Sequence, residues 1–268
     1  YLFYCLYYIG GKRNPLFIII YLILVAGGFI WFLATTFPYI HPWHQPFAFF
    51  ALYVTLTLFL VCILSDPGVI SQGTVQYYEN NYEYDNVLYK PQLCQTCQLW
   101  RPPRSKHCRI CGKCVARMDH HCPWINSCVG AQNMRYFLMM LLCTALYTTY
   151  GAFLTLLSLE AFVEESGIYR RFIYDEYLGG RRPVGWKEAL NYCGYYRSME
   201  MTLGIFCFLI SFVLYAFFAY TFYLSVVKNT LTAETFKYDT LRHMIKLHEH
   251  KLKQREERKK EREKEKEK

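Results

Sequence analysis

Cysteine and histidine are concentrated in one short stretch of this chain. Seven of the twelve cysteines and three of the eight histidines lie between Cys94 and Cys128. Two C-x-x-C pairs, Cys94/Cys97 and Cys108/Cys111, can each aim two thiolates at one zinc ion, about 2.3 Å from each sulfur. Two closed tetrahedral sites need eight ligands, whereas the stretch offers ten, so two candidates are surplus. A disulfide framework is typical of small secreted chains, so the clustering favours metal binding in a reducing compartment.

A surplus cysteine could do chemistry, because a thiolate that holds no metal is a strong nucleophile. The sequence RMDHHCPWINSC (residues 117–128) places an aspartate and two histidines beside a cysteine. A free cysteine, a free histidine and the aspartate would supply a nucleophile, a base and an orienting acid. Residue types alone leave open which residues are surplus. A purely structural two-zinc module with spare residues is the alternative.

Four long apolar runs without charged side chains flank this stretch and must position it. A transmembrane helix needs about 20 mostly apolar residues, and each run has about that length. The chain is 53% hydrophobic, and its 25 tyrosines suit a membrane interface. Buried soluble helices could explain any one run, but four in one chain favour a membrane protein. The sequence predicts an all-α polytopic membrane protein with four transmembrane helices, at Pro15–Phe37, Pro46–Ser65, Tyr136–Leu159 and Met201–Val227.

The distribution of Lys and Arg predicts the orientation in the membrane. Four crossings leave the N-terminus, residues 66–135 and the tail from Lys228 on one side, with 24 basic residues. The other side holds six, all in the connector 160–200, which also carries seven acidic residues. The excess of positive charge marks the cytosolic side. We therefore expect the cysteine-rich stretch and both termini to be cytosolic. No signal peptide is visible.

Composition divides the chain into five segments. The tail reads either as a basic segment held against anionic lipid or as a solvated, charge-mixed helix or disordered end. No recognition fold accompanies the charge, so nucleic acid binding is not expected. The segments are 1–65 (helices 1 and 2), 66–93 (linker), 94–135 (two-zinc module), 136–227 (helices 3 and 4 with the lumenal loop 160–200) and 228–268 (tail).

Several motifs together resemble the DHHC-type protein S-acyltransferases, or palmitoyltransferases. The spacing of the cysteines carries most of the resemblance, and Leu231 stands where a TTxE motif would have its first Thr. The family's later C-terminal aromatic-and-Asn motif is not visible in the tail. The matching residues are Asp119 to Trp124 (DHHCPW), Asn133 and Phe137 beyond it, Asp66-Pro67-Gly68 (a DPG motif), and Thr232 and Glu234 of TTxE.

The resemblance implies a role for each candidate ligand. One structural Zn²⁺ would be held by Cys94, Cys97, His107 and Cys114, and the other by Cys108, Cys111, His121 and Cys128. Asp119, His120 and Cys122 would remain for catalysis. The family's reaction is a two-step acyl transfer, in which Cys122 accepts a palmitoyl-type chain from acyl-CoA and passes it to a cysteine of a substrate protein.

The same resemblance suggests substrate-binding roles for five further residues. Arg101, Arg104 and Lys106 could grip coenzyme A phosphates, or could serve lipid headgroups or solubility. Trp124 would pack near the catalytic cysteine and the acyl head, or simply in the module core. Tyr147 would lie near the closed end of an acyl tunnel and limit the chain to about sixteen carbons, or it is an ordinary packing residue.

The compartment and the partners are also expectations. The lead-in Tyr82 to Tyr89 resembles an endoplasmic-reticulum branch of the family, which acts on membrane proteins with cysteines next to their spans; the Golgi is second. A non-catalytic scaffold that uses the zinc module to bind partners is one alternative, but it would not need Asp119, His120 and Cys122. A transporter or channel is another, and the four apolar runs lack the charged residues expected there.

Overall fold

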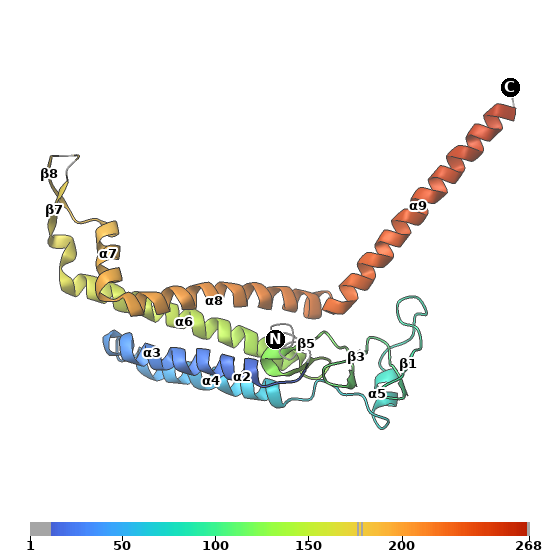
Figure 1. Ribbon diagram of the computed structural model, residues 1–268, viewed down its shortest axis with the longest axis horizontal. Coiled ribbons are helices and arrows are strands. Elements are labelled where there is room, and N and C mark those ends of the chain that lie inside the picture. The colour runs from blue at the N-terminus through green and yellow to red at the C-terminus, as the bar shows by residue number, and fades with distance from the viewer. Residues whose placement is uncertain (1–11, 176, 178, 267–268) are drawn as a thin grey trace, which may run out of the picture.

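A computed structural model describes residues 12–175, 177 and 179–266, so the first eleven residues of the predicted segment 1–65 lie outside it. The fold is mostly helical, and four helical segments are long and apolar enough to cross a membrane, as predicted. Figure 1 shows them running side by side. They are Leu16–Thr35, His44–Leu64, Met134–Ser166 and Ser198–Val227. Their elements are α2 (Leu16–Leu22), the π-helical η1 (Ile23–Gly27) and α3 (Gly28–Thr35); α4 (His44–Leu64); α6 (Met134–Ser166); and α8 (Ser198–Phe222) with the π-helical η5 (Tyr223–Val227).

Helix α6 organises the bundle, because it packs along both α8 and α4. One core cluster joins Phe59 and Cys62 of α4 to Phe137 and Met140 of α6, and all four side chains are buried. At the other end of the bundle, Phe32 of α3 packs into a second cluster with α6 and α8. Large apolar side chains are also exposed on the outer faces of all four segments, for example Ile19, Phe50 and Phe212, as expected for helices in lipid.

The third and fourth spanning helices are longer than the apolar runs that predicted them. Helix α6 continues to Ser166 and ends only where Gly167 adopts a left-handed conformation, because Glu and Ala before it favour helix. Helix α8 begins at Ser198 and so includes Glu200, which is 1% exposed and lies 3.6 Å from Arg197. Both helices therefore include charged residues that lie outside the charge-free runs, Arg135, Glu160, Glu164 and Glu165 on α6 and Glu200 on α8.

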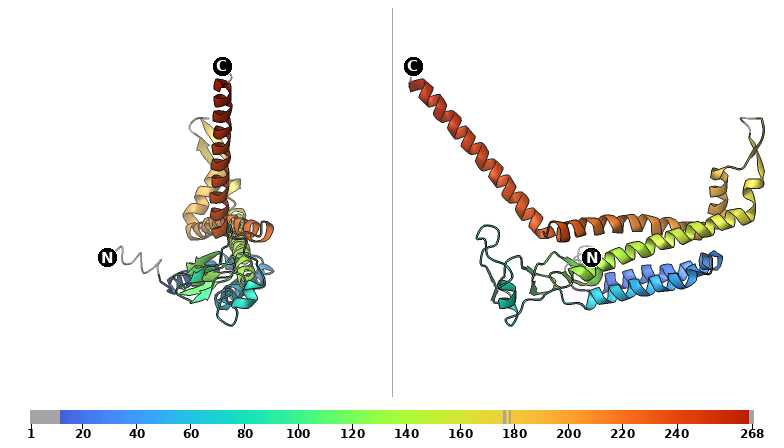
Figure 2. Two further views of the ribbon diagram at one scale, coloured as in Figure 1. Left: turned by 90° about the vertical axis from the view of Figure 1, so that its right-hand side faces the viewer. Right: turned by 180° about the vertical axis from the view of Figure 1, so that it is seen from behind.

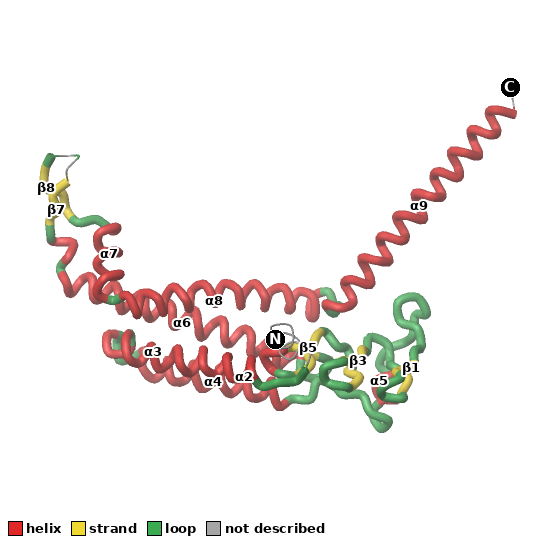
Figure 3. Tube along the Cα trace, in the orientation of Figure 1, coloured by secondary structure: helices red, strands yellow, loops and turns green. Residues whose placement is uncertain are grey.

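The segment between α4 and α6 is folded into short antiparallel hairpins, which the all-α prediction did not include. A short helix, α5 (Val75–Glu79), precedes them. The tube drawing of Figure 3 shows that loops and turns make up most of this segment. Its order therefore depends on side-chain clusters more than on long strands. The hairpins pair β1 (Leu93–Cys94) with β2 (Leu99–Trp100), β3 (Lys106–Cys108) with β4 (Lys113–Val115), and β5 (His120–Cys122) with β6 (Ser127–Val129).

The remaining elements extend from the two ends of the bundle. Figure 2 shows the last helix, α9 (Thr232–Lys266), running away from the bundle on the side of the hairpins. This agrees with the charge-mixed helix considered for the tail. The connector at the other end is a small folded unit. It contains η4 (Ile168–Arg170), β7 (Phe172–Asp175), β8 (Gly180–Pro183) and α7 (Trp186–Tyr196). Two further 3-10 turns lie elsewhere in the chain, η2 (Phe37–Tyr39) after α3 and η3 (Pro123–Ile125) between β5 and β6.

Gly130 lies at the junction between the hairpins, the DPG turn and α6. Asp66 Oδ1 accepts hydrogen bonds from the N–H groups of Gly68 and Val69 (2.6 and 2.8 Å), which closes the DPG turn. The turn then lies directly against Gly130. A Cβ at residue 130 would meet the carbonyl oxygen of Pro67 and, at 2.7 Å, a methyl group of Val115. Only glycine fits at this position.

We predict that Gly130→Ala destabilises the protein by about 1–3 kcal/mol, because the added methyl group overpacks this junction. Gly73→Ala is the matched control, since a Cβ there would meet only Ser71 Oγ at 4.0 Å. Thermal unfolding of both variants in detergent measures the difference. Equal unfolding midpoints for the two variants would contradict the close packing described here.

Candidate active site

Two clusters of three cysteines and one histidine lie in the hairpins. The members are Cys94, Cys97, His107 and Cys114 in one, and Cys108, Cys111, His121 and Cys128 in the other, the two sets expected from the sequence. The ligand atoms of each cluster lie within 4.8 Å of one another. The sets alternate along the chain, so the loops that form one cluster also form the other.

The spacing within each cluster fits a tetrahedral metal ion. His107 Nδ1 lies 3.4–3.7 Å from the sulfur atoms of its three cysteines. His121 Nδ1 lies 3.3–3.8 Å from those of its own. Donors at the corners of a tetrahedron about 2.0–2.3 Å from zinc are separated by roughly 3.6 Å. Both clusters could therefore hold a metal with four protein ligands and no open position.

The strand β5 directs the side chains of the two adjacent histidines, His120 and His121, to opposite faces. Successive side chains of a strand point to opposite faces. His121 pairs with Cys128 across the hairpin, and its ring belongs to the second cluster. Cys122 instead packs against the buried ends of α4 and α6, and the His120 ring lies 5.4 Å from that of Phe137. Among the seven cysteines of the stretch, Cys122 alone belongs to neither cluster.

Asp119 connects His120 to the start of α9. His120 Nδ1 donates a hydrogen bond to Asp119 Oδ2 at 2.7 Å. The N–H and hydroxyl of Thr232 donate to the same carboxylate, at 2.6 and 3.2 Å. Burial disfavours the charged forms of Asp119 and His120. The hydrogen bonds to His120 and Thr232 nevertheless lower the pKa of Asp119. The contacts of His120 with Asp119 and with the Cys122 side chain raise the pKa of His120 to about 9. The site therefore favours a carboxylate beside an imidazolium.

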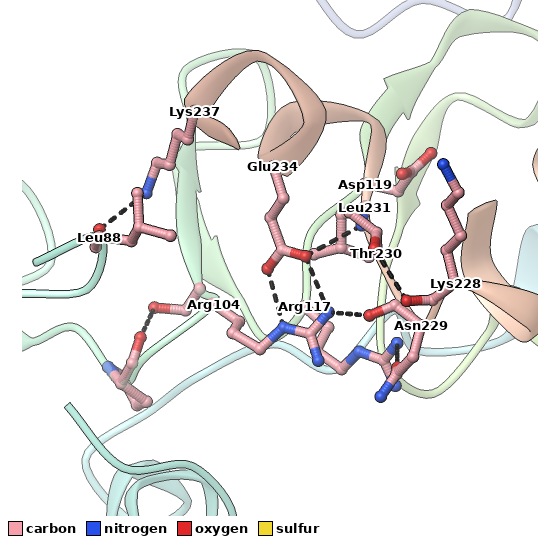
Figure 4. A network of polar contacts seen from close by, with 12 residues as sticks. Leu88, Arg104, Arg117, Asp119, Lys228, Asn229, Thr230, Leu231, Glu234 and Lys237 are labelled. Atoms are coloured by element: carbon pink, nitrogen blue, oxygen red, sulfur yellow. Dashed lines mark hydrogen bonds and ion pairs between the residues drawn. The ribbon is translucent and has the colours of Figure 1, made fainter. Parts of the chain in front are cut away.

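A second set of contacts fastens the start of α9, as Figure 4 shows. Arg104 Nε and Nη2 donate to the two oxygens of Glu234, both at 2.8 Å, and Nη2 also donates to the carbonyl of Asn229. Arg117 Nη2 donates to Asn229 Oδ1 at 2.7 Å. Burial alone would raise the pKa of the Glu234 carboxyl, but the hydrogen bonds and the charge of Arg104 lower it below its ordinary value. Leu231, which replaces the first Thr of the motif, is 2% exposed.

These contacts change the expectation for the basic residues near the first cluster. The guanidinium of Arg104, expected at a phosphate, is already bonded within the protein. Its link to Glu234, 130 residues away, was not anticipated from the sequence, although the TTxE resemblance had marked Glu234. Lys106 is exposed and Arg101 is partly exposed. In the described part of the chain, neither forms a hydrogen bond or ion pair with Asp119, His120 or Cys122.

Asn133 and Phe137 join the hairpins to α6. Asn133 is fully buried, accepts a hydrogen bond from the N–H of Gly130 and donates one to the carbonyl of Cys128, both at 2.9 Å. Phe137 is 1% exposed and lies against His120. This junction places Cys122 at the end of the helix bundle.

Cys122 lines a largely apolar cavity of about 760 Å³ between the spanning helices. Ligand sites are commonly about 300–1,000 Å³. Trp124 also lines it, and its ring, 41% exposed, meets the edge of Phe17 at 5.2 Å. Tyr147 lies further along the same cavity, where its hydroxyl donates to the carbonyl of Val25 at 3.4 Å. The arrangement offers a thiol beside a charged histidine at the mouth of an apolar chamber.

We predict that Asp119→Asn lowers the free energy of unfolding, because it removes the charged acceptor shared by His120 and Thr232. The loss should be about 1–3 kcal/mol near pH 6. Unfolding in detergent measures it, with the exposed Asp239→Asn as the control.

The loss of unfolding free energy caused by Asp119→Asn should become smaller as the pH rises. A raised histidine pKa stabilises the fold fully below the unfolded value of about 6.5, and this contribution disappears as the pH rises through about 9. The low pKa of Asp119 keeps its carboxylate charged across this range. A loss that is equal near pH 6 and near pH 9.5 would contradict the ion pair.

Comparison with known proteins agrees with this geometry. The model of the DHHC palmitoyltransferase family matches residues 87–239. Palmitoyltransferase ZDHHC4 of Mus musculus is 30% identical over 239 residues, which cover 85% of this chain and 67% of that protein. Palmitoyltransferase swf1 of Schizosaccharomyces pombe is 38% identical over 144 residues, 51% of this chain and 39% of that protein. The chain therefore belongs to the DHHC palmitoyltransferase family and is a protein palmitoyltransferase.

Proposed function

We propose that Cys122 carries the acyl chain between the two steps of palmitoyl transfer. The observation that supports this most is its position, outside both metal clusters and at the mouth of the apolar cavity, beside His120. In the first step the Cys122 thiolate attacks the thioester carbonyl of palmitoyl-CoA. A new carbon–sulfur bond forms, the bond to coenzyme A breaks, and His120 gives its proton to the departing thiolate.

The second step reverses the roles of the thiols. His120 accepts the proton of a cysteine on the substrate protein, and that sulfur attacks the acyl-enzyme. The chain moves to the substrate, and Cys122 leaves as a thiolate. Asp119 holds His120 in orientation through Nδ1 and stabilises its charged form. One thioester replaces another in each step, so no ATP or redox cofactor is required.

The two clusters would each hold a structural Zn²⁺. Four protein donors surround each position, so no site remains open for a water molecule, and the metal supplies folding free energy rather than a catalytic group. Because the ligand sets alternate along the chain, loss of either ion would disturb both loops. Cys122 would then lose its place at the cavity.

The cavity would hold the acyl chain while coenzyme A stays in water. Arg101 and Lys106 are our candidates for the coenzyme A phosphates, since Arg104 is engaged with Glu234. Trp124 would cover the chain near the thioester, and Tyr147 would contact it deeper in the bundle. Asn133 and Phe137 position the module, and Thr232 positions Asp119.

The charge distribution supports a cytosolic site. We propose that the module 94–135 and both ends of the chain face the cytosol, because 24 of the 30 Lys and Arg residues would lie on that side. Substrates would then be proteins with cytosolic cysteines close to the membrane. The endoplasmic reticulum is our first choice of compartment, from the lead-in Tyr82 to Tyr89, and the Golgi is the second.

Labelling of the purified protein with a clickable palmitoyl-CoA analogue tests the nucleophile. We predict a hydroxylamine-sensitive adduct that disappears in Cys122→Ser while the zinc content stays near two per chain. Cys143→Ser, outside the module and the cavity lining, should keep the adduct. An adduct that persists in Cys122→Ser would refute the assignment.

A metal ligand should behave differently from the nucleophile. We predict that Cys94→Ala loses zinc and thermal stability together, because an unfilled cluster leaves its loops without a core. Zinc content by mass spectrometry and the unfolding midpoint measure the effect. Retention of two zinc ions in this variant would remove Cys94 from the ligand set.

A further inference from the structure

Helix α7 lies across the direction of the spanning helices, as Figures 1 and 2 show. It ends at Tyr196, and α8 begins directly afterwards, at Ser198. The apolar run of α8 starts at Met201. The five residues from Tyr196 to Met201 rise only about 8 Å in a helix. Since the headgroup layer on each side of a bilayer is roughly 5–8 Å thick, α7 lies at the depth of the lipid headgroups.

Arg197, between the two helices, fixes the angle at which they meet. Its backbone N–H donates to the carbonyl of Cys193 at 2.7 Å, which closes the last turn of α7. Its guanidinium lies 3.6 Å from the carboxylate of Glu200 on α8. The same group lies over the rings of Tyr39 and Phe162, 3.8 and 4.7 Å from their centroids. Contacts with η2, α6 and α8 therefore hold α7 in its crosswise direction.

One side of α7 packs against protein. Ala189 and Tyr192 belong to an apolar cluster that also contains Ile173 of β7. Arg182 of β8 donates to Glu188 Oε1 at 2.7 Å and so neutralises the acidic residue of α7. Figures 1 and 2 show β7 and β8 beyond α7, on the side away from the bundle. The packed side of α7 therefore faces away from the membrane.

The opposite side of α7 is exposed, and it faces the membrane beside α8. Its large side chains are Trp186, Leu190 and Tyr195, which are 68%, 49% and 80% exposed. Lys187 is exposed as well, and its Nζ lies over the Trp186 ring, 5.7 Å from the centroid. Through Met199, which is 61% exposed, this surface continues onto the lipid-facing side of α8. Trp and Tyr are enriched at this depth in membrane proteins.

A phospholipid layer fits the exposed side of α7 in chemistry and in charge. Apolar and aromatic side chains of a helix that lies in the interface enter the boundary between headgroups and acyl chains. Because Glu188 is already bound by Arg182, the positive charge of Lys187 is available to lipid phosphates. A protein partner would have to displace the lipids that surround α8 at the same depth.

We propose that α7 is an interfacial membrane helix. Trp186, Leu190 and Tyr195 lie among the phospholipids of the leaflet opposite the module 94–135, and Lys187 binds their phosphate groups. This membrane contact adds a segment parallel to the surface to the four that cross it, and it is independent of the proposed role of Cys122. Arg197 joins α7 rigidly to α8, so the lipid contacts also fix the end of the bundle at the membrane surface.

Labelling by a phospholipid whose headgroup carries a diazirine tests the contact. The full chain is reconstituted in nanodiscs of phosphatidylcholine and phosphatidylglycerol and irradiated, and mass spectrometry measures the label on each peptide. Trp43, 75% exposed just before α4, lies at the same end of the bundle and supplies the reference. Val87, 64% exposed in the segment at the other end, supplies the background. The ratio to the Trp43 label does not depend on the amount of inserted protein.

The paired variant Lys187→Glu with Leu190→Glu weakens the contact without touching the packed side of α7. Lys246→Glu with Leu247→Glu on α9 is the matched control, because Leu247 is 47% exposed and Leu190 is 49% exposed. Slow hydrogen exchange in β7 and β8 reports whether the unit stays folded in each variant.

We expect wild-type label on α7 that is comparable to the label on Trp43 and far above the label on Val87. The paired variant on α7 should lower it roughly tenfold, since one basic residue at an anionic surface contributes about a factor of five. The control pair should leave it unchanged. Wild-type label on α7 at the level of Val87 would assign the exposed side to water or to a protein partner and overturn the inference. Equal label in the wild type and in the folded α7 variant would also overturn it.

Discussion

The alternation of side chains along the three residues of β5 is the constraint on which the site depends. His121 must face Cys128 and the second cluster, so His120 and Cys122 on either side of it must face the other way. A shift of one residue in the pairing would exchange the two histidines. It would also place Cys122 at the metal. The register of the hairpin thus keeps His120 and Cys122 away from the residues of the second metal cluster.

Buried charges extend that constraint to distant parts of the chain. Asp119 is bound by His120 on one side and by Thr232 on the other, and Arg104 is bound by Glu234. Partners that are more than 100 residues apart thereby come together beside the cysteine-rich hairpins. Because a buried charge without its partner is costly, these contacts fix the start of α9 against the site. The orientation of the His120 imidazolium therefore depends on the start of α9 as well as on the hairpins.

Much of this arrangement could be predicted from the sequence. Four uncharged runs marked the four helices, since length and hydropathy suffice for spans in lipid. Ligand counting required surplus residues, and the resemblance to the family selected both sets that the fold brings together. These features are local, or repeat a spacing that a known family shares.

Features that depend on contacts between distant segments could not be predicted in this way. Nothing near Arg104 indicates Glu234 as its partner, and Gly130 looks like any loop glycine until the DPG turn packs against it. The predicted fourth span stopped short of Glu200, because a hydropathy criterion ends a span at a charged residue. The helix nevertheless includes Glu200, whose carboxylate forms an ion pair with Arg197. Residues of separate helices line the apolar cavity together, which no single segment reveals.

Native mass spectrometry of the acyl-enzyme examines the division of roles within the cysteine-rich stretch most directly. The purified protein is incubated with palmitoyl-CoA, weighed intact, and then fragmented to locate the chain. We expect one species that carries two zinc ions and one palmitoyl chain together, with the chain on Cys122. A palmitoyl chain on any cysteine of the two clusters, or an acylated species that has lost a zinc ion, would contradict it.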